Sequence, residues 1–298
     1  MEFRVLQYFL AIAREESISA AAETLHITQP TLSRQIKELE DEFGKQLFVR
    51  GNRKITLTEE GMLLRKRAEE ISSLVEKTQA EMNALDNELS GDIYIGGGET
   101  QGMRFIIKAI QRMQATYPMV HFHLYSGNAD DVGDRLDKGL LDFGLFIEPA
   151  NMSKYDFIQL PTKDVWGVLM RKDSPLATKE YIVANDLIDL PIIYSSQQMV
   201  KNIISGWMQK HDDKLSLIAS YNLIYNASLM VEDGAGYALT LDGLINTTGD
   251  SPLCFRPLQP KLEVGLALVW KKYQVFSKAA EYFLKELQNI IDEANQTT

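Results

Sequence analysis

A run of three glycines is the first feature of this sequence that could carry chemistry. Gly96, Gly97 and Gly98 follow an apolar stretch that ends at Ile95, and a pattern typical of a helix begins after Gly102. A glycine-rich turn between a strand and a helix is how dinucleotide-binding and P-loop proteins hold phosphate groups on backbone N–H groups. A nucleotide-dependent α/β enzyme is therefore one interpretation of this segment.

The details of the segment argue against nucleotide binding. The third glycine, Gly102, stands one position too late for the pattern G-x-G-x-x-G, and Glu99 places a negative charge where a pyrophosphate would lie. The next expected strand ends at Tyr125 without the acidic residue that would hold a ribose, and no P-loop lysine is present. The nucleotide-dependent enzyme remains only a minor alternative, and we expect the glycines to serve another purpose.

Other catalytic and metal-binding patterns are also missing from the sequence. It contains no G-x-S-x-G elbow, no H-E-x-x-H motif and no cysteine–histidine pairing. His121 and His123 alternate along one expected strand, but a third metal ligand is not apparent, and ordinary strand packing is the simpler interpretation. A single cysteine, Cys254, excludes an internal disulfide and fits a reducing compartment. We expect no enzymatic activity, no cofactor and no metal.

Polar and basic side chains near the amino terminus could instead bind DNA. A net charge of −10 argues against a nucleic-acid partner for the chain as a whole, yet residues 50–54 read RGNRK, with three cations in five residues. Opposite an apolar helical stripe of Leu32, Ile36 and Leu39 lies a set of hydroxyl, amide and cationic groups able to reach base edges. Its members are Gln29, Thr31, Ser33, Arg34 and Lys37.

The elements around this set form a small helical domain with a wing. Residues 3–13 show helical spacing, and two further helices follow, with Ser19 and Thr28 as expected N-caps and Pro30 in the first turn of the second. Residues 47–49 and 55–57 are then expected to pair as two strands. The tip of this wing would place its cations against the DNA backbone or in the minor groove, namely Arg50, Arg53 and Lys54.

A long helix with a heptad pattern is expected next. Thr58 provides an N-cap, and apolar or small residues recur at alternating steps of four and three, which favours a two-stranded coiled coil. A pair of chains would present two recognition helices to a roughly palindromic site. The seam consists of Leu64, Ala68, Ile71, Val75, Thr78, Met82, Leu85 and Leu89.

After residue 90 the pattern changes to strands that alternate with helices, which predicts parallel sheets in two α/β subdomains. The expected strands are 93–95, 121–125, 142–147, 165–170, 192–194, 215–219, 237–240 and 264–270. The expected helices are 103–117, 130–140, 199–210 and 225–233, with a last helix around 276–290.

The amino-terminal residues resemble the winged helix-turn-helix of LysR-type transcriptional regulators. The resemblance rests on Phe9, the run from Ser17 to Leu25 with Ala21 and Ala22, Gln29, Pro30, Ser33, Arg34, Ile36, Leu39, Glu40, Gly44, Leu47, Phe48, Arg50, Leu57, Thr58 and Gly61. It implies that the helix matching residues 29–40 enters the major groove, with DNA contacts by Gln29, Pro30, Thr31, Ser33, Arg34 and Lys37.

The resemblance also implies a domain order and a set of partners. A winged helix-turn-helix domain would span 1–58, a coiled-coil linker helix 59–89, and an effector-binding domain 91–298. That domain would resemble periplasmic solute-binding proteins, with one subdomain at 91–162 and 265–298, the other at 163–264, and crossings near 160–163 and 261–264. The expected partners are double-stranded operator DNA, a small-molecule effector and a second or further copies of the chain as a homodimer or homotetramer. RNA polymerase is a further candidate partner.

In this family the effector binds between the two subdomains, which assigns a set of residues to the cleft. By position these are Gly98, Glu99, Thr100, Gln101, Phe146, Glu148, Tyr194, Ser195, Ser196, Gln197 and Thr240. Two acidic residues, Glu99 and Glu148, depart from what many relatives carry and suggest a neutral, amine-bearing or amphoteric effector.

A solute-binding transport component is the other alternative, and it fits residues 91–298. It leaves residues 1–89 without a purpose, and the sequence shows neither an export signal nor an apolar run of the roughly 20 residues needed to cross a bilayer. We therefore expect a cytoplasmic, ligand-responsive DNA-binding regulator of transcription.

Overall fold

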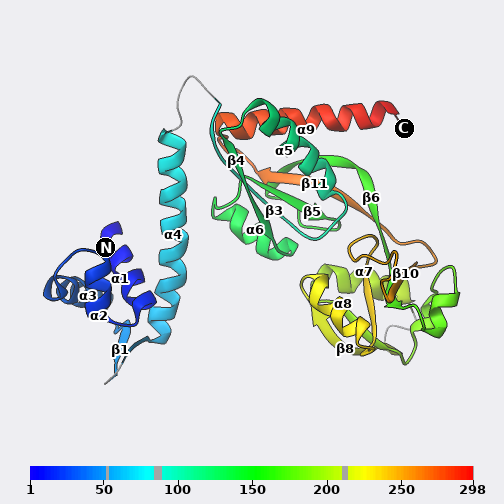
Figure 1. The fold of residues 1–298 in the computed structure, drawn as a ribbon, viewed down its shortest axis with the longest axis horizontal. Helices are drawn as coiled ribbons and strands as arrows, with labels where there is room; N and C mark the ends of the chain where they lie inside the picture. The colour runs from blue at the N-terminus through cyan, green and yellow to red at the C-terminus, as the bar shows by residue number, and fades with distance from the viewer. Residues whose placement is uncertain (52–53, 84–88, 210–213, 298) are drawn as a thin grey trace. The chain divides into compact units, whose positions relative to one another are not determined.

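The computed structural model describes residues 1–51, 54–83, 89–209 and 214–297. The chain divides into two compact units, Met1–Asn83 and Ala84–Thr298 (Figure 1). Within the described ranges, no helix combines the length and apolar character that a membrane crossing requires.

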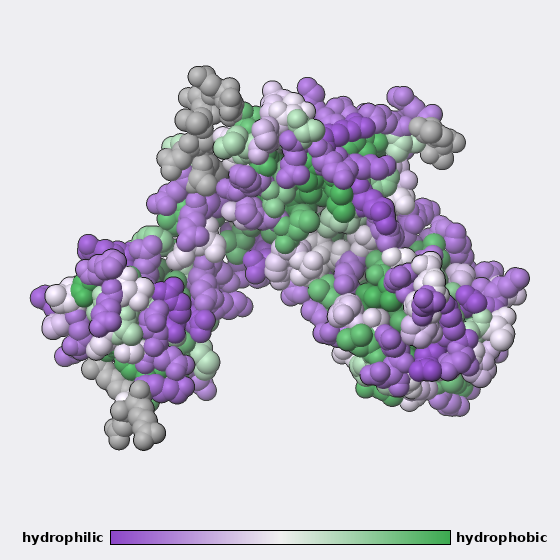
Figure 2. Space-filling model, viewed as in Figure 1, coloured by the Kyte–Doolittle hydropathy of each residue, from purple (hydrophilic) through white to green (hydrophobic). Residues whose placement is uncertain are grey.

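The first unit is a helical domain with a two-stranded wing, as the sequence predicts. Its elements are α1 (Phe3–Glu15), α2 (Ile18–Thr24), α3 (Gln29–Phe43), β1 (Phe48–Arg50), β2 (Ile55–Leu57) and α4 (Glu59–Asn83). The core contains Phe9 and Ile12 of α1, Ala21 of α2, and Leu32 and Ile36 of α3, all buried. The small side chain of Ala21 allows the helices to approach closely, and the face of the unit visible in Figure 2 is mostly hydrophilic.

The cap of α2 differs from the prediction. Ser17, and not Ser19, is the N-cap, because its hydroxyl oxygen accepts a hydrogen bond from the backbone N–H of Ala20 at 3.3 Å. The cap of α3 is Thr28, as expected, with its hydroxyl accepting from the N–H of Thr31. In both cases a side-chain oxygen satisfies a donor that the first helical turn leaves free.

The seam expected along α4 is used in more than one way. Leu64 and Ala68 pack against the core of the first unit, whereas Ile71 and Met82 are exposed. Leu89 does not continue the helix and packs against a core of the second unit. Leu85 lies outside the described residues. The part of α4 that is available to pair with a second copy of the chain is therefore shorter than the heptad pattern predicts.

The second unit is built on a mixed sheet with the strand order β4-β3-β5-β11-β6-β9-β7-β8, in which β10 also pairs with β6. Pairing is parallel between β3 and both β4 and β5, and between β7 and both β8 and β9. The pairs that involve β6 and β11 are antiparallel, which corrects the expectation of parallel sheets only. The strands are β3 (Gly91–Gly97), β4 (Val120–Ser126), β5 (Phe143–Ile147), β6 (Tyr155–Arg171), β7 (Pro191–Ser195), β8 (Ser216–Tyr221), β9 (Tyr237–Leu241), β10 (Leu253–Pro257) and β11 (Glu263–Lys271).

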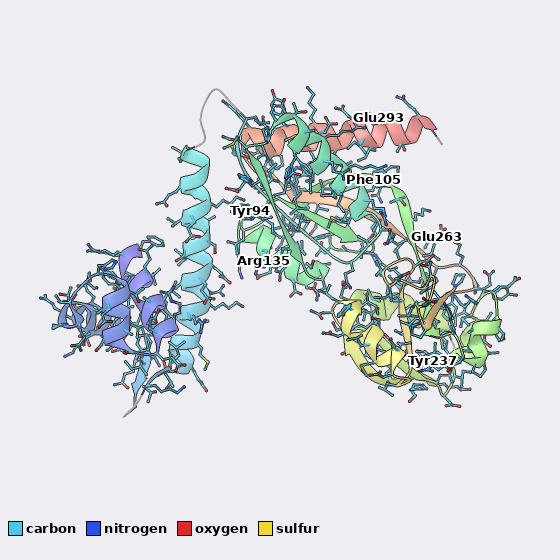
Figure 3. All side chains as sticks on the ribbon, in the orientation of Figure 1. Tyr94, Phe105, Arg135, Tyr237, Glu263 and Glu293 are labelled. Atoms are coloured by element: carbon cyan, nitrogen blue, oxygen red, sulfur yellow. The ribbon has the colours of Figure 1, made fainter. Side chains whose placement is uncertain are left out.

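Helices cover both ends of this sheet. They are α5 (Met103–Thr116), α6 (Ala129–Asp137), α7 (Gln198–Met208), α8 (Ile224–Glu232) and α9 (Lys278–Thr297), with short 3-10 helices at Pro175–Thr178 and Ala184–Leu187. Helices α5 and α9 lie together over one part, where Arg112 pairs with Glu286 at 3.1 Å and with Glu293, labelled in Figure 3, at 2.6 Å. The sequence prediction missed β10 and the first ten residues of β6.

Strands β6 and β11 connect two subdomains. Strand β6 pairs with β11 as far as Val165, and from Trp166 onward it pairs with β9 and β10 instead. The first crossing thus lies a few residues after the expected 160–163. The chain returns at Glu263, which is paired with Val165 and falls within the expected range.

Glycines of β3 and of the loop before α5 allow close packing. A Cβ atom on Gly96 would lie 2.5 Å from Cδ1 of Leu141 and 3.0 Å from a methyl group of Val132, and one on Gly102 would lie 2.3 Å from Cδ1 of Leu266. Any side chain at these positions would displace its neighbours. The glycine run therefore brings β3 and the start of α5 close to the surrounding elements.

Candidate DNA-binding surface and effector cleft

Helix α3 presents the polar face that the sequence predicts. Leu32, Ile36 and Leu39 are buried beneath it, which fixes the rotation of the helix about its axis. The residues on the other side are exposed or half-buried. They are Gln29, Thr31, Ser33, Arg34 and Lys37, which are polar, and Pro30. Their donors lie along the first two turns, where the helix dipole favours a nearby phosphate.

Arg34 is held by an acidic neighbour on the same helix. Its Nε donates to Oε1 of Glu38 at 2.8 Å, and Gln35 donates to the other carboxylate oxygen at 2.9 Å. The hydrogen bond to Glu38 and its negative charge raise the pKa of Arg34. Both side chains are largely exposed, so the pair contributes little to stability and can exchange for a DNA partner.

The wing is present, and one of its three cations has a described side chain. Strand β1 pairs with β2 in antiparallel register, with Arg50 opposite Ile55. Arg53 lies outside the described residues, and the side chain of Arg50 is not described either. Lys54 is exposed and its Nζ lies 3.1 Å from Oε2 of Glu16.

Glu40 ties the wing to the recognition helix. Its carboxylate oxygen Oε1 accepts from the backbone N–H groups of Leu47 at 2.8 Å and Phe48 at 3.3 Å. Part of the acidic cluster at the end of α3 therefore has a structural role on the inner side of the wing. Gly61 lies against the same turn, since a Cβ there would be 2.1 Å from the carbonyl oxygen of Leu47.

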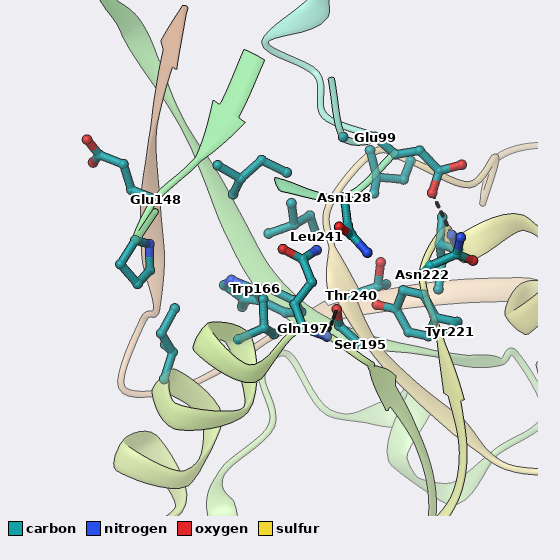
Figure 4. Close-up of a pocket in the computed structure, with 17 residues that line it drawn as sticks. Glu99, Asn128, Glu148, Trp166, Ser195, Gln197, Tyr221, Asn222, Thr240 and Leu241 are labelled. Atoms are coloured by element: carbon teal, nitrogen blue, oxygen red, sulfur yellow. Dashed lines mark hydrogen bonds between the residues drawn. The ribbon is translucent and has the colours of Figure 1, made fainter. Parts of the chain in front are cut away.

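A cleft opens in the second unit at the carboxyl ends of β3, β5, β7, β8 and β9, where open α/β sheets bind ligands. Figure 4 shows the residues around it. Both subdomains contribute to its lining: Gly98, Glu99, Asn128, Ile147, Glu148, Pro149, Trp166, Ser195, Gln197, Val200, Ile203, Tyr221, Asn222, Ile224, Thr240, Leu241 and Leu244.

Residues of the loop after β3 connect the two subdomains across this cleft. Glu99 Oε2 accepts from the backbone N–H of Ile224, the first residue of α8, at 2.5 Å. The Thr100 hydroxyl donates to Oδ2 of Asp164 at 2.5 Å, and the Gln101 amide donates to the carbonyl oxygen of Gly243. Thr100 and Gln101 therefore link the two subdomains and are not among the residues that line the cleft.

The acidic residues give the cleft less negative character than the sequence suggests. Glu99 is engaged by the N-terminus of α8. The Glu148 carboxylate occupies the space beside Gly265, where a Cβ would lie 2.2 Å from its Oε2, and Figure 4 shows it directed away from Gln197 and Thr240. The expectation of a neutral, amine-bearing or amphoteric effector stays a prediction.

Other predicted contacts lie elsewhere. Phe146 is buried in a separate core beside Tyr155, with ring centroids 5.5 Å apart, because its side chain points to the opposite face of β5. Tyr194 lines a neighbouring pocket, and Ser196 is exposed beyond the end of β7. The predicted residues that do line the cleft are Gly98, Glu99, Glu148, Ser195, Gln197 and Thr240.

No group of three or more potential ligands among the described residues is arranged to hold a metal ion. Nε2 of His123 lies 2.8 Å from Oδ1 of Asp92, and the imidazole stacks on the ring of Tyr94, as is common in strand packing.

Asp164 makes the closed arrangement sensitive to pH. Burial raises its pKa, the hydrogen bond from Thr100 lowers it in part, and the charge of Asp242 raises it further. A raised pKa in the folded state means that the free energy of unfolding increases as the pH falls toward and through that pKa. Asp164→Asn keeps an acceptor for Thr100 and removes the buried charge.

We expect Asp164→Asn to be more stable than the wild type at pH 7, with an advantage that shrinks as the pH is lowered toward 4. Urea unfolding at several pH values measures the difference. Asp156→Asn, an exposed position on the same strand, is the matched control and should show no such trend. A constant difference between Asp164→Asn and the wild type at all pH values would contradict the assignment.

Comparison with known proteins decides the family. Residues 3–62 match the model of the bacterial regulatory helix-turn-helix protein, lysR family, and residues 86–290 match the LysR substrate binding domain. The chain belongs to the LysR family. It is a DNA-binding transcriptional regulator with an effector-binding domain, and the family consists of regulators and not enzymes, as the sequence analysis expects.

Individual relatives of this LysR-family regulator span most of its length. It is 27% identical over 280 residues to the Hca operon transcriptional activator HcaR of Escherichia coli (strain K12), covering 91% of this chain and 92% of that one. It is 32% identical over 189 residues to the hydrogen peroxide-inducible genes activator of Pectobacterium carotovorum subsp. carotovorum, covering 63% and 62%. Its fold is similar to full-length CbnR complexed with target DNA, with a TM-score of 0.75, 16% identity and coverage of 97% and 100%.

Several cleft residues of the LysR-family regulator escaped sequence reasoning. Asn128 caps α6 with its side-chain oxygen, which leaves its amide N–H groups toward the cleft lining. Tyr221 donates its hydroxyl to the carbonyl oxygen of Leu239 at 2.6 Å, and burial raises its pKa, which keeps the phenol neutral. Asn128 lies three residues after the expected strand 121–125, so the rule that strand ends line the cleft could have found it. Trp166 gave no such signal.

Proposed function

We propose that this regulator binds double-stranded operator DNA as a dimer or tetramer and responds to a small molecule in the cleft between its two effector subdomains. The observation that carries the proposal is that the chain has both an exposed polar recognition face on α3 and a cleft in the second unit. The first supports sequence-specific base contacts, and the second supports a small-molecule signal.

The DNA contacts proposed for α3 and the wing have different roles. Gln29, Thr31, Ser33, Arg34 and Lys37 carry groups that distinguish base pairs in the major groove. The wing cations Arg50, Arg53 and Lys54 are proposed to contact phosphates, which fixes the register of the protein on the duplex without reading sequence. The fold is similar to that of CbnR in its complex with target DNA, which supports DNA binding but assigns no role to single residues.

Pairing through α4 supports the proposed oligomer. Ile71, Leu74 and Met82 are large apolar side chains that remain exposed on this helix. A second copy of the chain would cover them and would place a second α3 on the duplex, so that an operator with two half-sites is expected. The short usable seam suggests that contacts outside α4 also contribute to the oligomer.

Thiol oxidation through an internal disulfide is not the proposed signal, although one relative is a hydrogen peroxide-inducible activator. The chain has a single cysteine. Cys254 is buried, and burial raises the pKa of its thiol, which lowers the fraction of reactive thiolate at neutral pH. A bound small molecule is therefore the better-supported signal.

A metabolite panel tested on the full chain examines the effector part of the proposal. A compound present at about 100 times its dissociation constant should stabilise the protein by about 2.7 kcal/mol, which a thermal shift assay detects. The same compound should change the extent or bending of the DNA footprint, because a ligand shifts the equilibrium between states that it binds differently. Identical footprints with and without a stabilising compound would contradict the proposed response.

Lys54→Ala examines the role of the wing. We expect weaker binding to all DNA sequences alike and a salt dependence whose slope is smaller by about one, because one phosphate contact is lost. Binding titrations on operator and unrelated DNA at several salt concentrations measure both quantities. Loss of discrimination between the two DNAs, with an unchanged slope, would show that Lys54 reads bases.

A further inference from the structure

A second cavity lies beside the cleft, within the subdomain that contains α7. It has a volume of about 140 Å³, compared with about 50 Å³ for the cleft itself. Helix α7 contributes Ile204, Ser205 and one cation, Lys201, and the neighbouring strands and their flanks contribute mainly apolar side chains, among them Leu215 and Leu239. We call this cavity the side pocket.

The side pocket and the cleft share a wall. Trp166, Ser195 and Val200 line both cavities. They come from β6, β7 and α7, so the boundary is made of side chains and contains no intervening layer of the fold. A molecule that enters the cleft therefore reaches the side pocket by passing these side chains only.

Trp166, which lines both cavities, has a buried indole donor without a described hydrogen-bond partner. The residue is 4% exposed, and its Nε1 has no hydrogen-bond partner among the described residues. Figure 4 draws the ring among the side chains around the cleft. A buried N–H without an acceptor is costly, because folding removed it from water and supplied nothing in return. An acceptor atom on a ligand would remove that cost.

The size and lining of the side pocket indicate what else the ligand carries. An engineered apolar cavity of about 150 Å³ stays dry and binds benzene. The side pocket has nearly the same volume, but it is partly open, and Lys201, Ser195 and Ser205 join its aliphatic and aromatic lining. It would take an apolar group of about six carbon atoms, whereas the cleft in this closed form has room for only a small polar group.

We propose that the effector is an amphiphile whose small head has an oxygen that accepts a hydrogen bond from Trp166 Nε1, and whose apolar arm fills the side pocket. This inference rests on the proposed function, since it assumes that the cleft is the effector site. The head lies near Ser195 and Thr240, which supply hydroxyl groups, and the arm passes Val200. The proposed head carries no cation, because Glu99 already accepts from the backbone N–H of Ile224 and the Glu148 carboxylate lies beside Gly265.

Primary alkanamides of increasing length, from acetamide to octanamide, test the proposal on the full chain. All carry the same neutral head with a carbonyl acceptor, and only the arm changes. We expect affinity to rise about fourfold for each methylene buried, and to stop rising beyond hexanamide because the pocket is then full. Thermal shift and calorimetric titration give the affinities.

Two variants separate the head from the arm. Ile204→Phe fills the side pocket and should abolish the dependence on chain length while leaving acetamide binding unchanged. Trp166→Phe keeps an aromatic side chain, though a smaller one, and removes the donor, so every amide should bind about tenfold more weakly with the same increase per methylene. Ile218→Phe makes the same kind of change at an exposed position on β8 outside the pocket, and should behave as the wild type.

Equal affinities for acetamide and hexanamide, or a chain-length dependence that Ile204→Phe leaves intact, would overturn the proposal. Absence of binding by every amide up to its solubility limit would overturn it as well. Operator binding and footprints measured on the same samples decide the proposed function separately. A protein that binds its operator and responds to some other metabolite, yet ignores the amides, would fail only the present inference.

Discussion

Arg34→Ala should lower the affinity for operator DNA by about 1–3 kcal/mol, roughly 5- to 150-fold, and should relax the preference for one base pair in each half-site. Arg34 is exposed on the recognition face of α3, and its guanidinium can donate two hydrogen bonds to a guanine. Binding titrations against a set of operators with single base changes would show which position loses its preference.

Glu38→Gln is the companion to this change. It leaves Arg34 in place and removes the carboxylate that now holds it. We expect operator affinity to stay the same or to rise, and affinity for unrelated DNA to rise more, because a negative charge near phosphate is lost. If Arg34→Ala kept the full set of base preferences, the assignment of this residue to base recognition would be wrong.

Gly61→Ala should destabilise the first unit by about 3 kcal/mol and abolish DNA binding at the temperatures where the wild type binds. The added methyl group would lie 2.1 Å from the carbonyl oxygen of Leu47, a backbone atom of the turn that leads into the wing. Relief of this contact requires α4 and the wing to separate. Thermal unfolding should show an early transition for the first unit and an unchanged transition for the second, since the two units are compact separately.

Gly206→Ala is the matched control for the glycine change. Gly206 also lies in a helix, α7, and nothing lies within 4 Å of the position that its Cβ would occupy. This substitution should stabilise the protein by about 0.5–1 kcal/mol, the ordinary advantage of alanine over glycine in a helix. Equal destabilisation by the two substitutions would show that the contact with Leu47 is not the cause.

Sequence reasoning was most successful where a local rule determines the structure. The apolar stripe of Leu32, Ile36 and Leu39 has helical spacing, and Thr28 and Pro30 mark the start of α3, so both the helix and its exposed face could be predicted. The position of Ser17 and Ser19 in one short run gave two candidate caps, and the choice between them depends on a backbone conformation that composition does not determine.

The cleft was predicted less well because it depends on which strands become neighbours. Gly98, Ser195 and Gln197, chosen because they follow expected strands, line the cleft. Phe146 was misplaced because side chains alternate along β5, and a continuous apolar run does not reveal which face each residue takes. Trp166 was missed because β6 was expected to begin at residue 165, and only the crossing of this strand between subdomains brings the indole to the cleft.

The pairing of β6 with β11 makes one subdomain an insertion within the other. Val165 and Glu263 are neighbours across an antiparallel ladder, so the 97 residues between them leave and rejoin the chain at almost the same point. If the inserted residues were removed, a short hairpin turn could join these two strands. The remaining subdomain would keep its own sheet and helices. A signal from the inserted part can travel as a change of twist in β6 and β11, through the loop after β3, or through Ile147 of β5, which packs against the core of the inserted part.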